Sequence, residues 1–331
     1  MPPDPDPAPA HPAPARSVIL LGASGTIGRA TCAELLARGV SVISLLRPGR
    51  ALPERDGLSQ MHVDLADAQA VMQAVAGSGA DAVMSCMASR SGRARDAWAV
   101  DHAAHLHVLD AARAEGIGRF VLLSAICVQK PLLEFQRAKL AFEAALQASG
   151  LCWSIVRPTA FFKSLSGQVA RVQAGKPFLM FGSGTLTACT PISDRDLARY
   201  LVDCLEDPAR ANLILPIGGP GPALTPRAQG EMIFELLEKP PRFRRVPVAL
   251  MDVIIATLSA LGKVSPALAD KAEFARIGRY YATESMLVWD AQAGRYDAKA
   301  TPAFGQDSLR AHYAALIRGE ARADLGEHAV F

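Results

Sequence analysis

The chain has 331 residues, of which 50% are hydrophobic, and a formal net charge of +3 at pH 7. This composition excludes a disordered protein. The small charge, without a dense basic block, argues against a nucleic-acid-binding protein, so no nucleic-acid partner is expected. Six cysteines are scattered without a CxxC pair, which favours free thiols over a metal site.

The N-terminal segment, MPPDPDPAPAHPAPAR, is rich in proline. It has neither an apolar core for secretion nor enough basic residues for an organelle transit peptide, so we expect residues 1–15 to be a disordered tail. The longest apolar run, Val246 to Gly262, is shorter than the roughly 20 residues that span a bilayer. It predicts a buried helix or one that docks on a surface, including peripheral membrane contact. These features together predict a cytoplasmic protein, most simply a bacterial one.

Short apolar runs alternate with segments of helical spacing through the first half of the chain. The predicted strands are residues 17–23, 40–47, 61–65, 81–88, 119–126 and 152–158. The predicted helices are residues 25–39, 66–77, 98–115 and 135–150. Strands that alternate with helices at this spacing predict a Rossmann-like α/β fold with a doubly wound parallel sheet.

After Pro158 the alternation becomes less regular. Residues 191–207 predict a helix capped by Ser193 or Asp194, and residues 211–221 predict a strand that ends in a turn. From about residue 240 the pattern is mainly helical. We therefore predict a dinucleotide-binding domain over 16–239 and a smaller, mainly helical substrate lobe over 240–331, packed on the carboxyl edge of the sheet, where such folds bind ligands.

The strongest local motif is LLGASGTIGRA, between the first predicted strand and the first predicted helix. Glycines there allow a tight turn and a close approach of a pyrophosphate to the backbone, and the helix N-terminus adds unpaired amides. In this position the motif predicts dinucleotide binding rather than a plain structural turn. The predicted cofactor-binding residues of the motif are Gly22, Ser24, Gly25, Thr26, Ile27 and Gly28.

The end of the second predicted strand indicates which dinucleotide binds. NAD-preferring enzymes place an acid there to hold the ribose hydroxyls, but this chain has Arg47. A guanidinium matches the extra phosphate of NADP, so we predict NADP(H) as the cofactor. Asp64, at the end of the third predicted strand, is a further cofactor-binding candidate that could accept from the adenine amino group.

The segment LLEFQRAKLAFE resembles the active-site helix of short-chain reductases, in which a tyrosine precedes a lysine by four residues. Lys139 is present, but Phe135 takes the place of the tyrosine. A lysine there can bind the nicotinamide ribose and hold a positive field at the reacting centre, so we predict that Lys139 is both catalytic and cofactor-binding. Ser124 ends the fifth predicted strand and either binds the cofactor or only caps a turn.

Longer stretches, among them SAICVQKPLLEFQRAK and RYYATESMLVWD, closely resemble the divinyl chlorophyllide 8-vinyl reductases. These are NADPH-dependent, atypical short-chain reductases of (bacterio)chlorophyll biosynthesis. The resemblance covers about Ser17 to Leu309. It implies that the substrate is a divinyl magnesium tetrapyrrole, chlorophyllide or protochlorophyllide, whose 8-vinyl group is reduced to ethyl. Phe135 fits the pattern of this family, and a vinyl group has no oxygen for a phenol to protonate.

Such a substrate implies a wide apolar slot with a basic rim. The main slot candidates are Phe135, Phe161 and Phe162, with Met286, Leu287 and Trp289 as further ones, although core packing is the simpler explanation for each. The rim candidates are Lys163, Arg242, Arg244, Arg245, Arg276 and Arg279. We predict no metal site, because the helix that carries His105 should pack on the sheet away from the slot.

Two other functions are compatible with the same motifs. One is a phenolic-type atypical reductase, which also uses a lysine without the tyrosine but acts on a smaller aromatic substrate. The other is a non-catalytic, NADP-sensing protein. The catalytic lysine argues against the second, and the size of the C-terminal lobe argues against the first.

Overall fold

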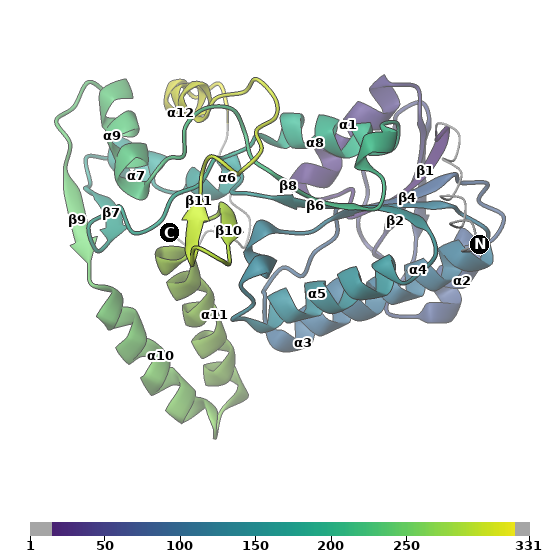
Figure 1. Ribbon diagram of the computed structural model, residues 1–331, viewed down its shortest axis with the longest axis horizontal. Helices are drawn as coiled ribbons and strands as arrows, with labels where there is room; N and C mark the ends of the chain where they lie inside the picture. Colours follow the sequence, from purple (N-terminus) through teal and green to yellow (C-terminus); the bar gives the residue numbers. More distant parts are fainter. Residues whose placement is uncertain (1–14, 322–331) are drawn as a thin grey trace, which may run out of the picture.

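The computed structural model describes residues 15–321, and its main sheet has seven parallel strands in the order β3-β2-β1-β4-β5-β6-β8 (Figure 1). These strands are β1 (Ser17–Leu21), β2 (Ser41–Leu46), β3 (Leu58–His62), β4 (Ala82–Ser85), β5 (Arg119–Leu123), β6 (Cys152–Pro158) and β8 (Leu213–Ile217). The predicted tail, residues 1–15, lies outside the described residues except for Ala15.

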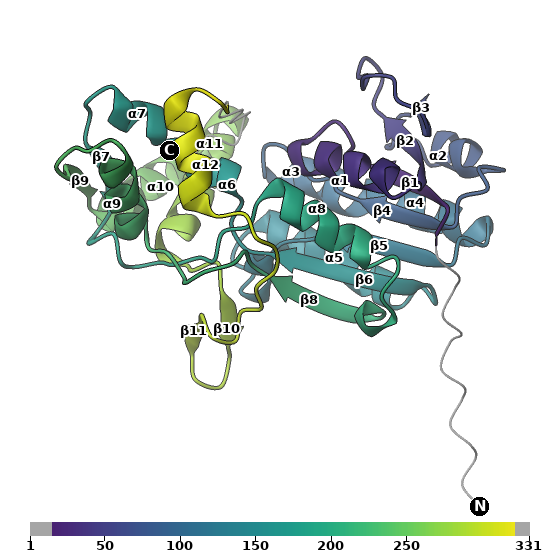
Figure 2. The ribbon, with the colours of Figure 1, turned by 90° about the horizontal axis from the view of Figure 1, so that it is seen from above.

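Helices cover both faces of the sheet. One face is covered by α1 (Thr26–Ala37) and α8 (Asp194–Asp203), and the other by α2 (Ala68–Val75), α4 (His105–Ala114) and α5 (Glu134–Gln147) (Figures 1 and 2). The central strands are apolar on both faces because both are covered, and all residues of β4 and β5 are buried. This arrangement confirms the predicted doubly wound parallel sheet.

Two local predictions differ from the structure, and a third is narrowed to one of its alternatives. The third strand is Leu58–His62 rather than residues 61–65, because a turn at Gly57, with φ of 78°, brings Leu58 beside Val42. The helix expected over 98–115 is divided into the π-helix η1 (Trp98–Ala104) and α4, and a short helix, α3 (Ala94–Ala97), precedes them directly. The extra residue per turn of a π-helix changes which side chains face the sheet. Of the two predicted caps of α8, Ser193 is the one observed.

The remaining elements form a lobe beyond the sheet edge, toward which β6 and β8 run (Figure 2). Its helices are α6 (Phe162–Leu165), α7 (Val169–Gln173), α9 (Pro226–Leu236), α10 (Val248–Gly262), α11 (Pro266–Thr283) and α12 (Leu309–Arg318). Its strands are β7 (Phe178–Phe181), β9 (Phe243–Val246), β10 (Val288–Asp290) and β11 (Arg295–Asp297), and two short 3₁₀ turns, η2 (Ile126–Gln129) and η3 (Pro208–Arg210), lie outside the lobe.

The lobe has a hydrophobic core of its own. Phe162 and Phe178 meet Phe234 and Tyr313 in it, so it contains residues from both sides of position 240. Strand β7 lies before residue 240 and β9 lies after it, and the two pair in parallel. The division into separate domains at residue 240 stays a prediction, but the lobe core itself is built from several stretches of the chain.

The two stretches that carried the family resemblance interlock in space. Gln129, in η2, donates to the Leu287 carbonyl and accepts from the backbone amide of Trp289 at 2.8 Å. Lys130 pairs with Glu284 at 2.7 Å, and its ammonium lies 4.8 Å from the centroid of the Trp289 ring. The loop after β5 is therefore held by the hairpin of β10 and β11.

Helix α10 occupies most of the apolar run from Val246 to Gly262. None of its residues is buried, so of the two predictions for this run the buried helix is wrong. Among the described residues, no helix combines the length and the hydropathy that a bilayer crossing requires.

Candidate cofactor and catalytic site

The glycine motif forms the turn between β1 and α1. Gly22 has a φ of +73°, and a Cβ added there would lie 2.7 Å from the backbone of Cys86 and Met87. A Cβ added at Gly28 would lie 2.1 Å from the Gly22 carbonyl oxygen. Gly25 is the N-cap residue of α1, and no side chain caps that end of the helix. The turn is thus tight and next to helix amides, which fits a dinucleotide diphosphate.

A lysine of the lobe reaches this turn. The Lys163 ammonium, on α6, donates to the Thr26 hydroxyl in the first turn of α1 at 2.8 Å. The residue follows β6 at the carboxyl edge of the sheet, and its side chain is partly buried. Lys163 was expected at a carboxylate-binding rim, but the structure places its charge at the glycine turn.

The two residues predicted to bind the adenosine half follow neighbouring strands. Arg47 comes directly after β2 and is exposed. Asp64 lies beyond β3, is exposed, and accepts from the Ala66 amide at 3.0 Å, so its carboxylate also shapes the turn before α2. Because β2 pairs with β3, both side chains lie at the same end of the sheet.

Lys139 lies on the buried side of α5 and is paired with a residue that the motif analysis did not include. Its ammonium donates to Asp101 Oδ1 at 2.9 Å, with 12% of the lysine side chain and 0% of the aspartate side chain exposed. Ser89 donates its amide to the same oxygen at 3.3 Å. Asp101 Oδ2 is buried and has no hydrogen-bond partner among the described residues. A carboxylate buried in this way normally needs such a cation.

A small cavity adjoins this pair. Its volume is about 10 Å³, close to that of one water molecule. The lining residues are Asp101, His105, Leu122, Leu123, Ser124, Lys139 and Phe142. Asp101 could have been found from the sequence, because it shares the spacing of the buried residues of its helix, where a carboxylate is unexpected.

His105 is fully engaged within the protein. Its Nδ1 lies 2.8 Å from the Val100 carbonyl and its Nε2 lies 2.7 Å from Ser85 Oγ. Burial lowers the pKa of His105 to about 4, although the nearby Asp101 charge opposes the shift. The ring is therefore neutral at pH 7, donating from Nδ1 and accepting at Nε2.

Ser124, at the end of β5, belongs to a second buried cluster. Its hydroxyl donates to Glu143 Oε1. Arg157, on β6, donates from Nε to the same oxygen at 3.2 Å and from Nη2 to Oε2. Glu143 is one helical turn beyond Lys139 on α5, so one helix carries two buried ion pairs.

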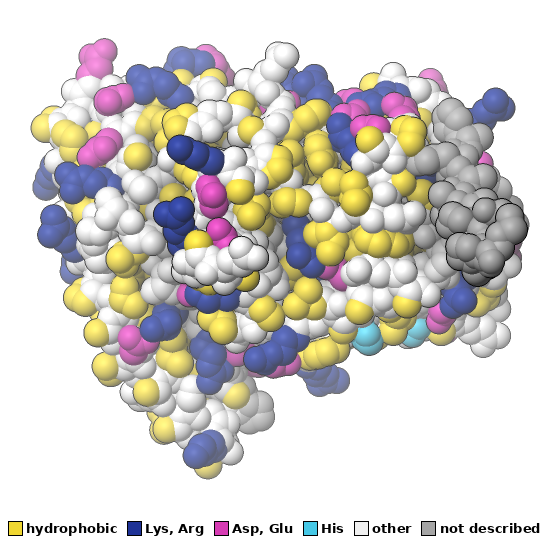
Figure 3. Space-filling view, viewed as in Figure 1, with side chains coloured by type: hydrophobic (Ala, Val, Ile, Leu, Met, Phe, Trp, Pro, Cys, Tyr) yellow, Lys and Arg dark blue, Asp and Glu magenta, His cyan; other side chains and the backbone are white. Residues whose placement is uncertain are grey.

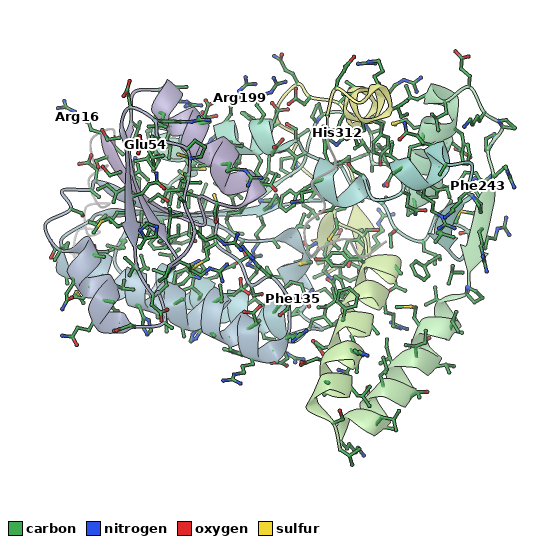
Figure 4. The ribbon with its side chains drawn as sticks, turned by 180° about the vertical axis from the view of Figure 1, so that it is seen from behind. Arg16, Glu54, Phe135, Arg199, Phe243 and His312 are labelled. Carbon is green, nitrogen blue, oxygen red and sulfur yellow. The ribbon has the colours of Figure 1, made fainter. Side chains whose placement is uncertain are left out.

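The three predicted slot residues lie in three different packing environments. Phe135 is nearly buried at the junction of α5 with the lobe, where it packs with Ile277, Tyr280 and other apolar residues (Figure 4). Phe161 is partly buried and packs against the core between the sheet and α8. Phe162 points into the lobe core, with its ring centroid 5.4 Å from that of His312. These residues do not form one continuous surface, and their role in substrate binding stays a prediction.

The predicted basic rim is also dispersed. Arg276 pairs with Glu273 at 2.9 Å within α11, and Arg279 pairs with Asp252 of α10. Arg244 and Arg245 are exposed on β9.

Comparison with known proteins first defines the class. A family model described as NAD(P)H-binding matches residues 22–208. The solved structure of MoeE5 in complex with UDP-glucose and NAD is similar in fold, with a TM-score of 0.67 at 19% identity over 91% of this chain and 97% of that one. The chain therefore has the fold of NAD(P)-dependent Rossmann-type enzymes.

The family follows from closer relatives. The divinyl chlorophyllide a 8-vinyl-reductase of Oryza sativa subsp. indica is 51% identical over 95% of this chain and 82% of its own length. The protein of the same name from Arabidopsis thaliana is 45% identical over 94% of this chain and 79% of its own. The chain belongs to the divinyl chlorophyllide a 8-vinyl-reductase family and is an oxidoreductase, as the resemblance implied.

One prediction from the sequence is wrong by the same comparison. Four relatives at 45% to 51% identity are chloroplastic proteins by name, whereas the chain was expected to be a cytoplasmic, bacterial protein. That expectation rested on what the N-terminal segment lacks, and such an absence says little about location.

Proposed function

We propose that this chain uses NADPH to reduce the 8-vinyl group of divinyl chlorophyllide a to an ethyl group. The observation that carries the proposal is the identity of 45% to 51% to 8-vinyl-reductases over 94% to 97% of this chain. This identity includes the lobe, which supplies the substrate side of the site, and is not limited to the widespread dinucleotide-binding half.

Two cations support the assignment of the cofactor. Arg47 stands where an acid would favour NAD, and its exposed guanidinium is available to the 2′-phosphate of NADP. Lys163 lies 2.8 Å from the Thr26 hydroxyl at the glycine turn, where it would hold the diphosphate. Ser24 and Ile27 would offer backbone amides to the same group, whereas the Gly25 amide already donates to the Gly22 carbonyl at 2.9 Å.

The chemistry needs a hydride and a proton to be added across a carbon–carbon double bond. When bound, the nicotinamide supplies the hydride. Hydride addition to the vinyl group places negative charge in the conjugated macrocycle, which disperses it, and the proton then goes to carbon. Lys139 contributes a fixed positive field, and Asp101 holds its ammonium in place at 2.9 Å. No oxygen has to be protonated, so the phenylalanine at position 135 removes nothing that the reaction requires.

The direct test is a turnover assay. The purified chain is incubated with NADPH and divinyl chlorophyllide a, and the pigments are separated by chromatography. We expect the monovinyl product, and none when NADPH is omitted. A parallel incubation with divinyl protochlorophyllide determines which pigment is preferred. Failure to form monovinyl product from either pigment would contradict the proposal.

The two cations predict different effects on cofactor binding. Arg47→Ala should weaken NADPH binding by roughly 1.5–3 kcal/mol and leave NADH binding nearly unchanged, because only NADPH has the 2′-phosphate. Lys163→Met should weaken both alike, because both have the diphosphate. Titrations of each variant with both cofactors test this contrast. If Arg47→Ala weakened the binding of NADPH and NADH equally, Arg47 would not be the residue that binds the 2′-phosphate.

A further inference from the structure

Helices α10 and α11 form a hairpin that projects from the body of the molecule (Figures 1 and 4). The two helices pack closely, since a Cβ added at Gly262 would lie 2.9 Å from Ala269. The partly buried residues Met251, Ile255 and Leu258 mark the side of α10 that faces inward. The opposite side of α10 faces solvent.

That outer side is apolar. Leu250, Ile254 and Leu261 lie within about 40° of one another on a helix of 3.6 residues per turn, with Val253 beside them. Val253 is 63% exposed, and Val264, in the turn after α10, is 86% exposed. Thr257 shares this stripe, but its hydroxyl donates to the Val253 carbonyl at 2.9 Å and so needs no water. A contiguous apolar stripe of this kind marks an interaction surface.

The same segment carries the positive charge of the molecule. Residues 242–283 contain seven Lys and Arg and three Asp and Glu, whereas the rest of the chain contains 28 and 29. The three acids each pair with an arginine, Asp252 with Arg279, Asp270 with Arg93 and Glu273 with Arg276. The exposed cations left without a carboxylate partner among the described residues are Arg242, Arg244, Arg245, Lys263 and Lys271.

The cations lie at both ends of the apolar stripe. Arg244 and Arg245 come just before α10, and Lys263 comes just after it. Figure 3 shows hydrophobic and basic side chains together on this projecting part of the surface. An apolar helix flanked by cations is the pattern of a helix that lies in the interface of an anionic membrane. A second copy of the chain fits less well, because a two-fold contact through this face would bring the unpaired cations of both copies together.

We propose that the outer face of α10, with the turn at Lys263 and Val264, docks this protein on the surface of an anionic lipid bilayer. The helix lies in the plane of the interface and does not cross it. Apolar side chains enter the boundary of the acyl chains, while the cations at both ends contact lipid phosphates. This inference does not depend on the reaction that the protein catalyses.

The test is co-sedimentation of the full chain with vesicles of phosphatidylcholine, with and without phosphatidylglycerol, at low and high salt. We expect binding to the phosphatidylglycerol vesicles that falls as salt is raised. Arg244→Ala and Arg245→Ala should each weaken it about fivefold, as expected for about 1 kcal/mol per cation near an anionic surface. Val253→Glu/Leu261→Glu should abolish it, and both side chains are exposed, so the fold should be retained.

The matched control is Leu213→Glu/Ile214→Glu, which places the same two charges at residues 46% and 38% exposed on β8, at the edge of the sheet. It should bind vesicles like the unmodified chain. Equal sedimentation with and without phosphatidylglycerol, or unchanged binding of Val253→Glu/Leu261→Glu, would overturn the proposal. Light scattering without lipid tests whether a second copy of the chain occupies this face instead. A dimer that Val253→Glu/Leu261→Glu converts to a monomer would also overturn the proposal.

Discussion

Helix α5 carries two buried ion pairs one turn apart, and their surroundings differ. Glu143 has a partner for each oxygen, with Arg157 on both and Ser124 on one. Asp101, the partner of Lys139, keeps one buried oxygen without a hydrogen bond among the described residues and adjoins a small cavity. An unpaired buried acceptor costs roughly 1–3 kcal/mol, more when it is charged, so a structure built only for stability would satisfy it. From this difference we propose that the Glu143 pair is structural and that the Lys139 pair serves the reaction.

The largest expected effect is that of Lys139→Met. Turnover with saturating NADPH should fall on the order of a hundredfold, the scale for losing one preorganised charge. The free energy of unfolding should also fall by about 3–5 kcal/mol, because Asp101 loses its counterion. Turnover assays and urea denaturation measure the two losses.

The double variant Lys139→Met/Asp101→Asn is the control for that experiment. It should regain most of the stability, since no buried charge is left unpaired, but none of the turnover. Recovery of turnover in the double variant would mean that the lysine serves only to neutralise Asp101.

Glu143→Gln tests the other pair. It leaves Arg157 without its carboxylate and should lower the free energy of unfolding by about 3 kcal/mol. Arg157 is partly exposed, so its charge can still reach water. Turnover of the folded variant should remain within a few-fold of normal. A hundredfold loss of turnover, with stability intact, would contradict the division into a structural and a catalytic pair.

The pH dependence of stability sharpens the comparison, because His105 lines the cavity beside Lys139. Its pKa is lowered by burial to about 4 from 6.5, so between these values the unfolded chain binds a proton that the folded chain does not. The free energy of unfolding should therefore fall by up to about 3 kcal/mol as the pH drops from 6.5 to 4. The free energy of unfolding, measured by denaturation at several pH values in this range, should depend less on pH in His105→Gln. An unchanged slope would assign the pH dependence to other groups.

The smallest effect is expected for Ser124→Ala. Glu143 keeps Arg157, so stability should fall by only about 1 kcal/mol. NADPH titration then separates the two roles of the serine. An unchanged dissociation constant means that the hydroxyl acts only through Glu143, and a tenfold weaker one supports the predicted contact with the cofactor.

The sequence predicted the sheet and the glycine turn well because both follow from local patterns, the apolar runs and the short glycine spacing. The catalytic role of Lys139 was inferred from its position in a known motif and stays a prediction. The sequence analysis missed the partner of Lys139, because pairing Asp101 with a residue 38 positions away depends on how η1 packs on α5. The sequence analysis also grouped Phe161 with Phe162 as slot residues. The two are adjacent in the chain, but their side chains pack in two separate cores. Long-range packing of this kind leaves no periodic signal.

The contact between the β10–β11 hairpin and η2 has a consequence for synthesis on the ribosome. Gln129 and Trp289, which share a hydrogen bond, are 160 residues apart in the chain. The sheet can form as soon as its strands have emerged, since domains fold as they are made. The loop that leads into α5 is secured only when the hairpin has also been translated, close to the end of the described chain. A prematurely terminated product would thus have a dinucleotide-binding sheet, but its helix α5 would not be secured.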